Sequence, residues 1–192
     1  MTIVAPDPGG STLQYSRVLA YGLFNGNFGG VENTTCVFGV PTEPDDEPST
    51  SPVSYTAFAS GGSIVRVFTD GTFASYTVTG SQEAISVDLN TYTVDITMHL
   101  TGTLGNKSAS GSGASAETTV DFGTFTANDI EINDEPYSIG GLFNYQDFDL
   151  QMPFQGWFFG PKGKEIGIAV TYFRPNDPGY RAFGNITVTA SR

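Results

Sequence analysis

The sequence has few of the residues from which most catalytic and metal centres are built. Its 192 residues include one cysteine, one histidine and one tryptophan. A single cysteine excludes an internal disulfide and a cysteine-based metal cluster, and a single histidine excludes zinc sites with several histidine ligands. Any catalytic triad would depend on His99 alone. We therefore expect no enzyme, no catalytic residues and no metal site.

Positive charge and long apolar runs are also scarce. Eight lysines and arginines stand against twenty aspartates and glutamates, a formal net charge of −12. This charge repels phosphate backbones and anionic membranes, so nucleic acid is not an expected partner. No apolar stretch approaches the ~20 residues of a membrane-spanning helix. The N-terminus lacks the basic and apolar regions of a signal peptide. The chain itself is thus expected to have no transmembrane segment.

The sequence is instead rich in glycine and aromatic residues, with 24 glycines, 15 phenylalanines and 9 tyrosines. Such a composition is typical of short strands joined by tight turns. The clearest strand has apolar residues at every second position: Tyr92, Val94, Ile96, Met98 and Leu100. The same period recurs at 120–122, 157–159, 166–173 and 183–188. Six or more such strands predict an all-β sandwich or barrel, and no segment predicts a long helix.

Residues 65–78 predict a hairpin, because Asp70-Gly71 between two alternating runs favours a two-residue primed turn. Residues 42–52, acidic and proline-rich, and 105–117, rich in glycine and serine, predict exposed loops, the second of them mobile. Cys36 lies in an apolar run and is expected to be buried and inert.

Neighbouring residues of a strand point to opposite faces. His99 is therefore expected on the outer face with the threonines and Met98 in the core, so the two cannot both ligate one haem iron. A surface histidine is the expected outcome. The acidic run 128–135 lacks the spacing of a calcium-binding EF-hand loop, and no cofactor is predicted.

Two motifs carry a specific likeness. The first is FGVPT at 38–42, followed by Pro48 and VSYT at 53–56, and the second is GWFFGPKGKEIG at 156–167. In order and spacing they resemble the opening and the closing hairpin of transferrin-binding protein B-like barrel domains of Gram-negative bacteria. The glycines and proline of the second motif supply turn conformations, and Glu165 either turns inward to bond a turn amide or is solvated.

The resemblance implies an eight-stranded antiparallel up-and-down β-barrel over 13–192, after a flexible N-terminal segment over 1–12. It also implies a surface lipoprotein of the outer membrane, or a periplasmic protein, whose signal peptide has been removed. Such a protein would bind a protein or small solute, in iron or other nutrient uptake, through barrel loops at 44–52, 105–116 and 130–137.

Two other functions remain open. One is a lipocalin-like carrier of a small ligand or haem, with His99 or a loop tyrosine as the iron ligand. The other is a surface-assembly or adhesin component in which the barrel is a spacer.

Overall fold

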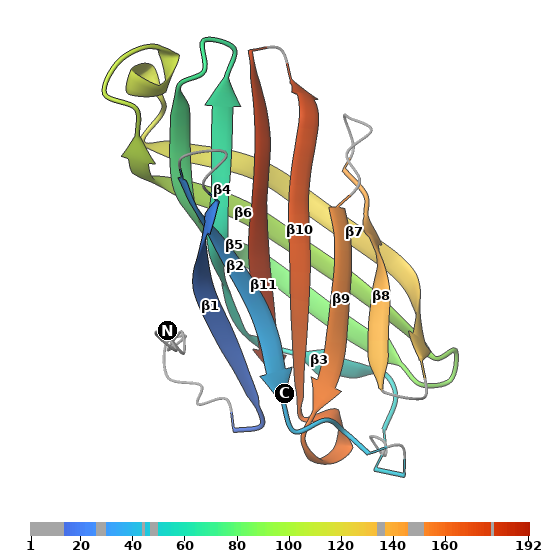
Figure 1. Ribbon diagram of the computed structural model, residues 1–192. Helices are drawn as coiled ribbons and strands as arrows, with labels where there is room; N and C mark the ends of the chain where they lie inside the picture. Colours follow the sequence, from blue (N-terminus) through green and yellow to red (C-terminus); the bar gives the residue numbers. More distant parts are fainter. Residues whose placement is uncertain are drawn as a thin grey trace.

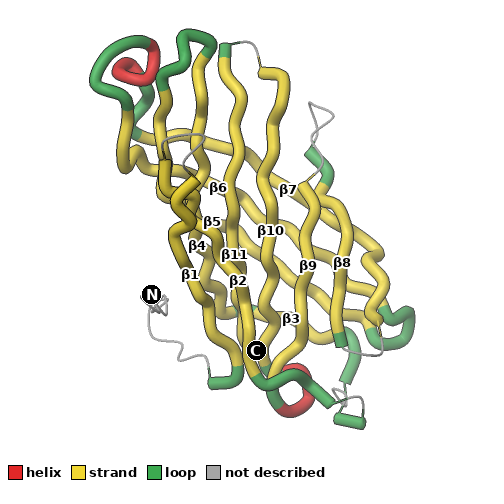
Figure 2. Tube along the Cα trace, in the orientation of Figure 1, coloured by secondary structure: helices red, strands yellow, loops and turns green. Residues whose placement is uncertain are grey.

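A computed structural model describes residues 14–25, 30–43, 45–46, 50–133, 137–145, 152–177 and 179–192. The predicted N-terminal segment 1–12 lies outside the described residues. Strands dominate the described residues, and helix occurs among them only as two short 3-10 segments (Figure 2). No helix in the described ranges is long and apolar enough to cross a membrane.

The strands follow one another along the chain. Their bounds are β1 (Ser16–Asn25), β2 (Gly30–Gly39), β3 (Val53–Tyr55), β4 (Ala57–Phe68), β5 (Phe73–Asp88), β6 (Thr93–Lys107), β7 (Thr119–Asn133), β8 (Ser138–Phe143), β9 (Met152–Phe159), β10 (Glu165–Asp177) and β11 (Tyr180–Ser191). The 3-10 helices are η1 (Ser112–Ser115) and η2 (Pro161–Gly163).

Strands β4 to β11 form a closed antiparallel ring of eight (Figure 1). Each strand pairs with the next along the chain, and β11 returns to pair with β4. The short β3 pairs with the second half of β5. Closure removes the open edges of a sheet. The predicted eight-stranded up-and-down barrel is confirmed, although β1 and β2 form a separate two-stranded sheet outside it.

Apolar side chains at alternate positions fill the interior of the barrel. On β6 these are Val94, Ile96, Met98 and Leu100, each at most 2% exposed. Inward side chains from the other strands of the ring join them in one core cluster, as expected for a barrel of this size. Tyr92 is wrongly predicted as part of this face, because it lies in the turn before β6 with positive φ (53°) and is 39% exposed.

The Asp70-Gly71 hairpin joins β4 to β5 as predicted, but its turn is of another type. The Phe68 amide donates to Thr72 O at 2.9 Å and the Gly71 amide to Phe68 O at 3.0 Å. Within this loop only Gly71 has positive φ (82°). The connection is therefore a three-residue loop with glycine in the left-handed position, and not a two-residue primed turn.

The β1–β2 hairpin lies over the outer face of the barrel, in front of β11 and β10 in Figure 1. Val18 and Val37 pack there on Phe159 and Trp157. Gly167 permits this approach, since a Cβ on it would lie 2.2 Å from Val37 Cγ1. Cys36, one residue away, is half-buried, so its predicted full burial is wrong.

Glu165 fastens the start of β1 to the barrel. Its carboxylate is 1% exposed and accepts hydrogen bonds from the Ser16 amide (2.8 Å) and hydroxyl (2.6 Å). The Gln14 and Tyr15 amides donate to the same carboxylate. Glu165 therefore bonds backbone amides, as one of the two alternatives predicted, but these amides belong to residues 14–16 and not to a turn. The other alternative, a solvated side chain, is wrong.

Glu83 is a half-buried acid, located where β5 leaves β4 and begins to pair with β3. Its Oε1 has no hydrogen-bond partner among the described residues. Burial raises the pKa of Glu83, and a hydrogen bond with Ser60 opposes the shift. Folding thus favours the protonated acid, so this contribution to stability is present below the pKa of the unfolded chain and is lost as pH rises through the folded pKa.

We expect Glu83→Gln to raise the melting temperature at neutral pH, because the amide removes the cost of a buried charge. At about pH 4, where the unfolded carboxyl is itself largely protonated, the difference should disappear. Melting curves at both pH values test this, with Glu131→Gln on the exposed side of β7 as the matched control. A lower melting temperature for Glu83→Gln at neutral pH would contradict the assignment.

Candidate functional site

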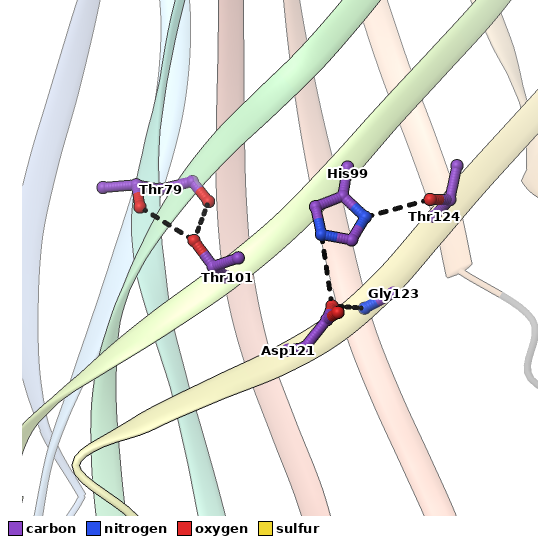
Figure 3. A network of polar contacts seen from close by, with 6 residues as sticks. All are labelled: Thr79, His99, Thr101, Asp121, Gly123 and Thr124. Carbon is purple, nitrogen blue, oxygen red and sulfur yellow. Dashed lines mark hydrogen bonds and ion pairs between the residues drawn. The ribbon is translucent and has the colours of Figure 1, made fainter.

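His99 projects from the outer face of β6, as predicted (Figure 3), while Met98 is 1% exposed in the core. Its Nδ1 lies 2.9 Å from Thr124 Oγ1, and its Nε2 lies 3.3 Å from Asp121 Oδ1. Asp121 also accepts from the Gly123 amide at 2.7 Å. A register shift between β6 and β7 at this point brings Asp121 beside His99. The carboxylate partner was not predicted.

A hydroxyl, an imidazole and a carboxylate in this order are the groups of a nucleophile–base–acid relay. Here they stand on the wall of the barrel, where the Asp121 side chain is 67% exposed. An acyl-transfer site also needs amides directed at a developing oxyanion. The amide nearest to the group, that of Gly123, is already bonded to Asp121. The arrangement serves better as a surface contact than as a catalytic site.

The predicted binding loops are only partly loops. Residues 105–107 continue β6 and 112–115 form η1, so the absence of regular structure predicted for 105–117 is wrong there. Residues 130–133 belong to β7. Thr42, at the start of the first loop, is buried and donates to Gly160 O at 2.9 Å. Positions 44, 47–49 and 134–136 lie outside the described residues.

The loop that carries η1 is bonded to the β4–β5 turn at the upper end of the barrel in Figure 1. The Ser108 amide donates to Phe73 O and the Phe73 amide to Ser108 Oγ, both at 2.9 Å. The Gly113 amide donates to Thr72 Oγ1 at 2.8 Å. These bonds hold two connections together around Phe73, which is 38% exposed. The result is an outer platform made of two connections bonded to each other.

Beneath this platform, five residues form one row of cross-strand partners. From β10 to β6 they are Arg174, Ala182, Arg66, Ala74 and Lys107. Directly opposed residues share a face of a sheet, and both alanines are fully buried in the core. The row, here called the upper row, therefore follows the inner face of the barrel near its end. It holds three of the eight basic residues of an acidic chain.

Aromatic rings surround Arg66. Its guanidinium carbon lies 4.5 Å from the ring centroid of Tyr180 and 5.4 Å from those of Tyr76 and Phe122. Arg174 contacts the same Tyr180, donating from Nη1 to the phenolic oxygen at 3.1 Å. Cation–π contacts offset part of the cost of removing a guanidinium from water, at ~0.5–2 kcal/mol each. They supply no hydrogen-bond acceptor for its N–H groups.

Two buried polar atoms of this cluster, Arg66 Nε and Tyr76 Oη, make no hydrogen bond of ordinary length and angle among the described residues. Burial raises the pKa of Tyr76, the charge of Arg66 and a hydrogen-bonding contact with its side chain oppose the shift, and Glu117 adds to it. Burial likewise raises the pKa of Tyr172, against the charges of Arg174 and Arg66. Both phenols therefore stay protonated at neutral pH. The cluster offers N–H and O–H donors that an oxygen acceptor would satisfy.

The upper row was not predicted from the sequence, although the position of Arg66 indicates it. Arg66 lies two residues after Ile64 and two before Phe68, so the period of two places its side chain on the inner, apolar face. A basic residue at an inward position requires a partner. Within the described ranges, no three or more His, Cys, Asp or Glu residues are grouped so as to hold a metal ion.

Comparison with known proteins gives neither a matching family model nor a matching curated protein. Among solved structures, the chain is similar to two mutants of the vaccine antigen transferrin binding protein B from Haemophilus parasuis Hp5. The identity is 17% in both, with TM-scores of 0.47 and 0.45. Each alignment covers 94% of this chain and 33% of the other. The chain thus spans about a third of the length of those structures.

Proposed function

We propose that this chain is a non-enzymatic binding protein of the transferrin-binding protein-like barrel family. It works at the surface or in the periplasm of a Gram-negative bacterium, in the uptake of iron or another nutrient. The observation that carries the proposal is the outer platform at the upper end, where the η1 loop is bonded to the β4–β5 turn. Connections held in place lose little conformational entropy on binding, which favours recognition of a partner.

The packing of the barrel favours an external partner over an enclosed ligand. Inward side chains from all eight strands of the ring form one buried cluster, which includes Tyr76, Phe125 and Phe143. Lipocalin-like carriers hold their ligand among such inward side chains. His99, the one histidine available to a haem, lies on the outer wall and is already engaged by Asp121. We therefore place recognition at the loops, with a protein or small solute as the partner.

The test is site-specific photo-cross-linking of the full-length gene product in its native organism. A photoreactive residue at Phe73 should give one discrete adduct in intact cells, and the protein should be found outside the cytoplasm. The same residue at Thr171, exposed on the wall of β10, is the matched control and should give none. A cytoplasmic protein, or equal adducts from both positions, would overturn the proposal.

A further inference from the structure

We propose that the upper row binds a ligand through a carboxylate, which pairs with the guanidinium groups of Arg66 and Arg174. The inference deepens the proposed function. It rests on that function only where it states that the partner or solute must carry a carboxylate. Its basis is local: a half-buried arginine on the inner face of the barrel, with a buried Nε that makes no hydrogen bond of ordinary length and angle among the described residues.

The charge of the Arg66 guanidinium favours an anionic ligand. A guanidinium that is partly removed from water is stabilised by an ion pair or by acceptors on its N–H groups. No ion pair between Arg66 and a carboxylate is present among the described residues, and the rings of Tyr180, Tyr76 and Phe122 lie 4.5 to 5.4 Å from its guanidinium carbon. The chain has a net charge of −12, yet no described acidic side chain pairs with Arg66. A ligand would supply that anion.

Arg66 and Arg174 are placed to engage one anion together. Both contact the ring of Tyr180, with guanidinium carbons 4.5 and 5.8 Å from its centroid. Between them in the row stands Ala182, and on the other side of Arg66 stands Ala74. Both alanines are fully buried, and neither offers an acceptor to the basic side chains. Two guanidinium groups on one side of a sheet are suited to one planar, bidentate oxyanion.

The charge of the chain and the rings around the row favour a carboxylate over a phosphate. Phosphate at neutral pH carries more than one charge, and the acidic chain disfavours it. A carboxylate carries one charge and commonly extends from an apolar body, which the rings of Phe122 and Tyr172 suit. The buried Tyr76 hydroxyl, which makes no hydrogen bond of ordinary length and angle among the described residues, adds a third donor. Glu117 lies near enough to influence Tyr76 and would compete with the ligand for the same positive field.

The probe is benzoate, titrated into the purified full chain and followed by the NMR signal of the Arg66 side-chain Nε–H group. We expect saturable binding in about the millimolar range, as for a ligand of so few atoms. Benzamide, the neutral isostere, should bind at least ~10-fold more weakly, which corresponds to the loss of one charge-assisted hydrogen bond. Inorganic phosphate should be weaker than benzoate. Equal binding of benzamide or preferred binding of phosphate would overturn the proposal.

Variants locate the site. Arg66→Gln and Arg174→Gln should each weaken benzoate binding ~10-fold or more, whereas Glu117→Gln should strengthen it. Arg181→Gln is the matched control, because Arg181 is exposed and pairs with Val67 on the opposite face of the sheet. If Arg66→Gln fails to fold, two other variants still test the site. One is Arg174→Gln, and the other is Arg66→Lys, which keeps the positive charge but lacks the paired N–H donors of the guanidinium. Unchanged binding in a folded Arg66 or Arg174 variant would disprove the assignment.

A tripeptide ending in phenylalanine, with a free or an amidated C-terminus, distinguishes the source of the carboxylate. Tighter binding of the free peptide than of benzoate would assign the site to a chain terminus, and equal binding would assign it to a small carboxylate solute. If the amidated peptide binds as well as the free one, the carboxylate is not recognised. These assays use purified protein, so the binding proposal can fail while the cellular role stands, or the reverse.

Discussion

Glu165→Ala is expected to lower the free energy of unfolding by about 3–5 kcal/mol, the usual cost of removing one partner of a buried charge. The glutamate carboxylate accepts from three consecutive amides and one hydroxyl at the start of β1. Truncation leaves the two buried Ser16 donors and the part-buried Gln14 and Tyr15 amides without this acceptor, at ~1–3 kcal/mol for each donor that stays buried. Release of the segment to water would limit that cost, at the expense of the packing between the β1–β2 hairpin and the barrel.

Denaturant unfolding measures the loss, and amide hydrogen exchange locates it. The amides of Gln14, Tyr15 and Ser16 should exchange much faster in Glu165→Ala, while those of β6 on the far wall should be unchanged under native conditions. Glu165→Gln, which keeps one acceptor oxygen, should fall between the variant and the native protein. Glu131→Ala, on the exposed side of β7, should change stability by no more than about 0.5 kcal/mol. Equal stability of the two alanine variants would show that Glu165 does not stabilise the attachment of β1 to the barrel.

The barrel was predictable because its signal is local. Alternation along β6 and the Asp70-Gly71 turn each depend on residues close in sequence, and burial of Val94, Ile96, Met98 and Leu100 follows from them. The predictions that were wrong concern positions where the backbone conformation of one residue determines the structure. Tyr92 continues the apolar period but takes a positive φ in the preceding turn. Gly71 alone takes the left-handed conformation, which changes the type of turn.

The contacts that secure β1 had no local signal. Glu165 is about 150 residues from its partners at 14–16. The period of two puts Glu165 on the face opposite to the inward Ile166, but it does not tell which outer positions a hairpin covers. Arg66 is the opposite case, because the period of two makes its inward position readable from the sequence, yet no partner was predicted for it. The information needed to suspect this part of the candidate site was therefore present in the sequence.

Gly167→Ala tests whether the β1–β2 hairpin packs directly on Gly167 of β10. The substitution should destabilise the protein by about 1–3 kcal/mol, as overpacking does. The added methyl would lie 2.2 Å from Val37 Cγ1 and 3.0 Å from the Phe159 ring. Valine is stiff at χ1, so it cannot turn that methyl away without cost. The hairpin must then move outward from β10. Gly61→Ala is the matched control, since a Cβ there meets nothing within 4 Å.

Val37→Ala should rescue the substitution, because it removes the methyl group that the new Cβ strikes. On its own it should be destabilising, since it empties part of the small cluster with Val18 and Phe159. Combined with Gly167→Ala, it should cost less than the two separate losses added together, with a coupling energy of about 0.5–3 kcal/mol for residues in contact. Denaturant unfolding of the four proteins in this cycle measures the coupling. Strict additivity would mean that the hairpin does not rest on Gly167, and that Glu165 alone fixes its place on the barrel.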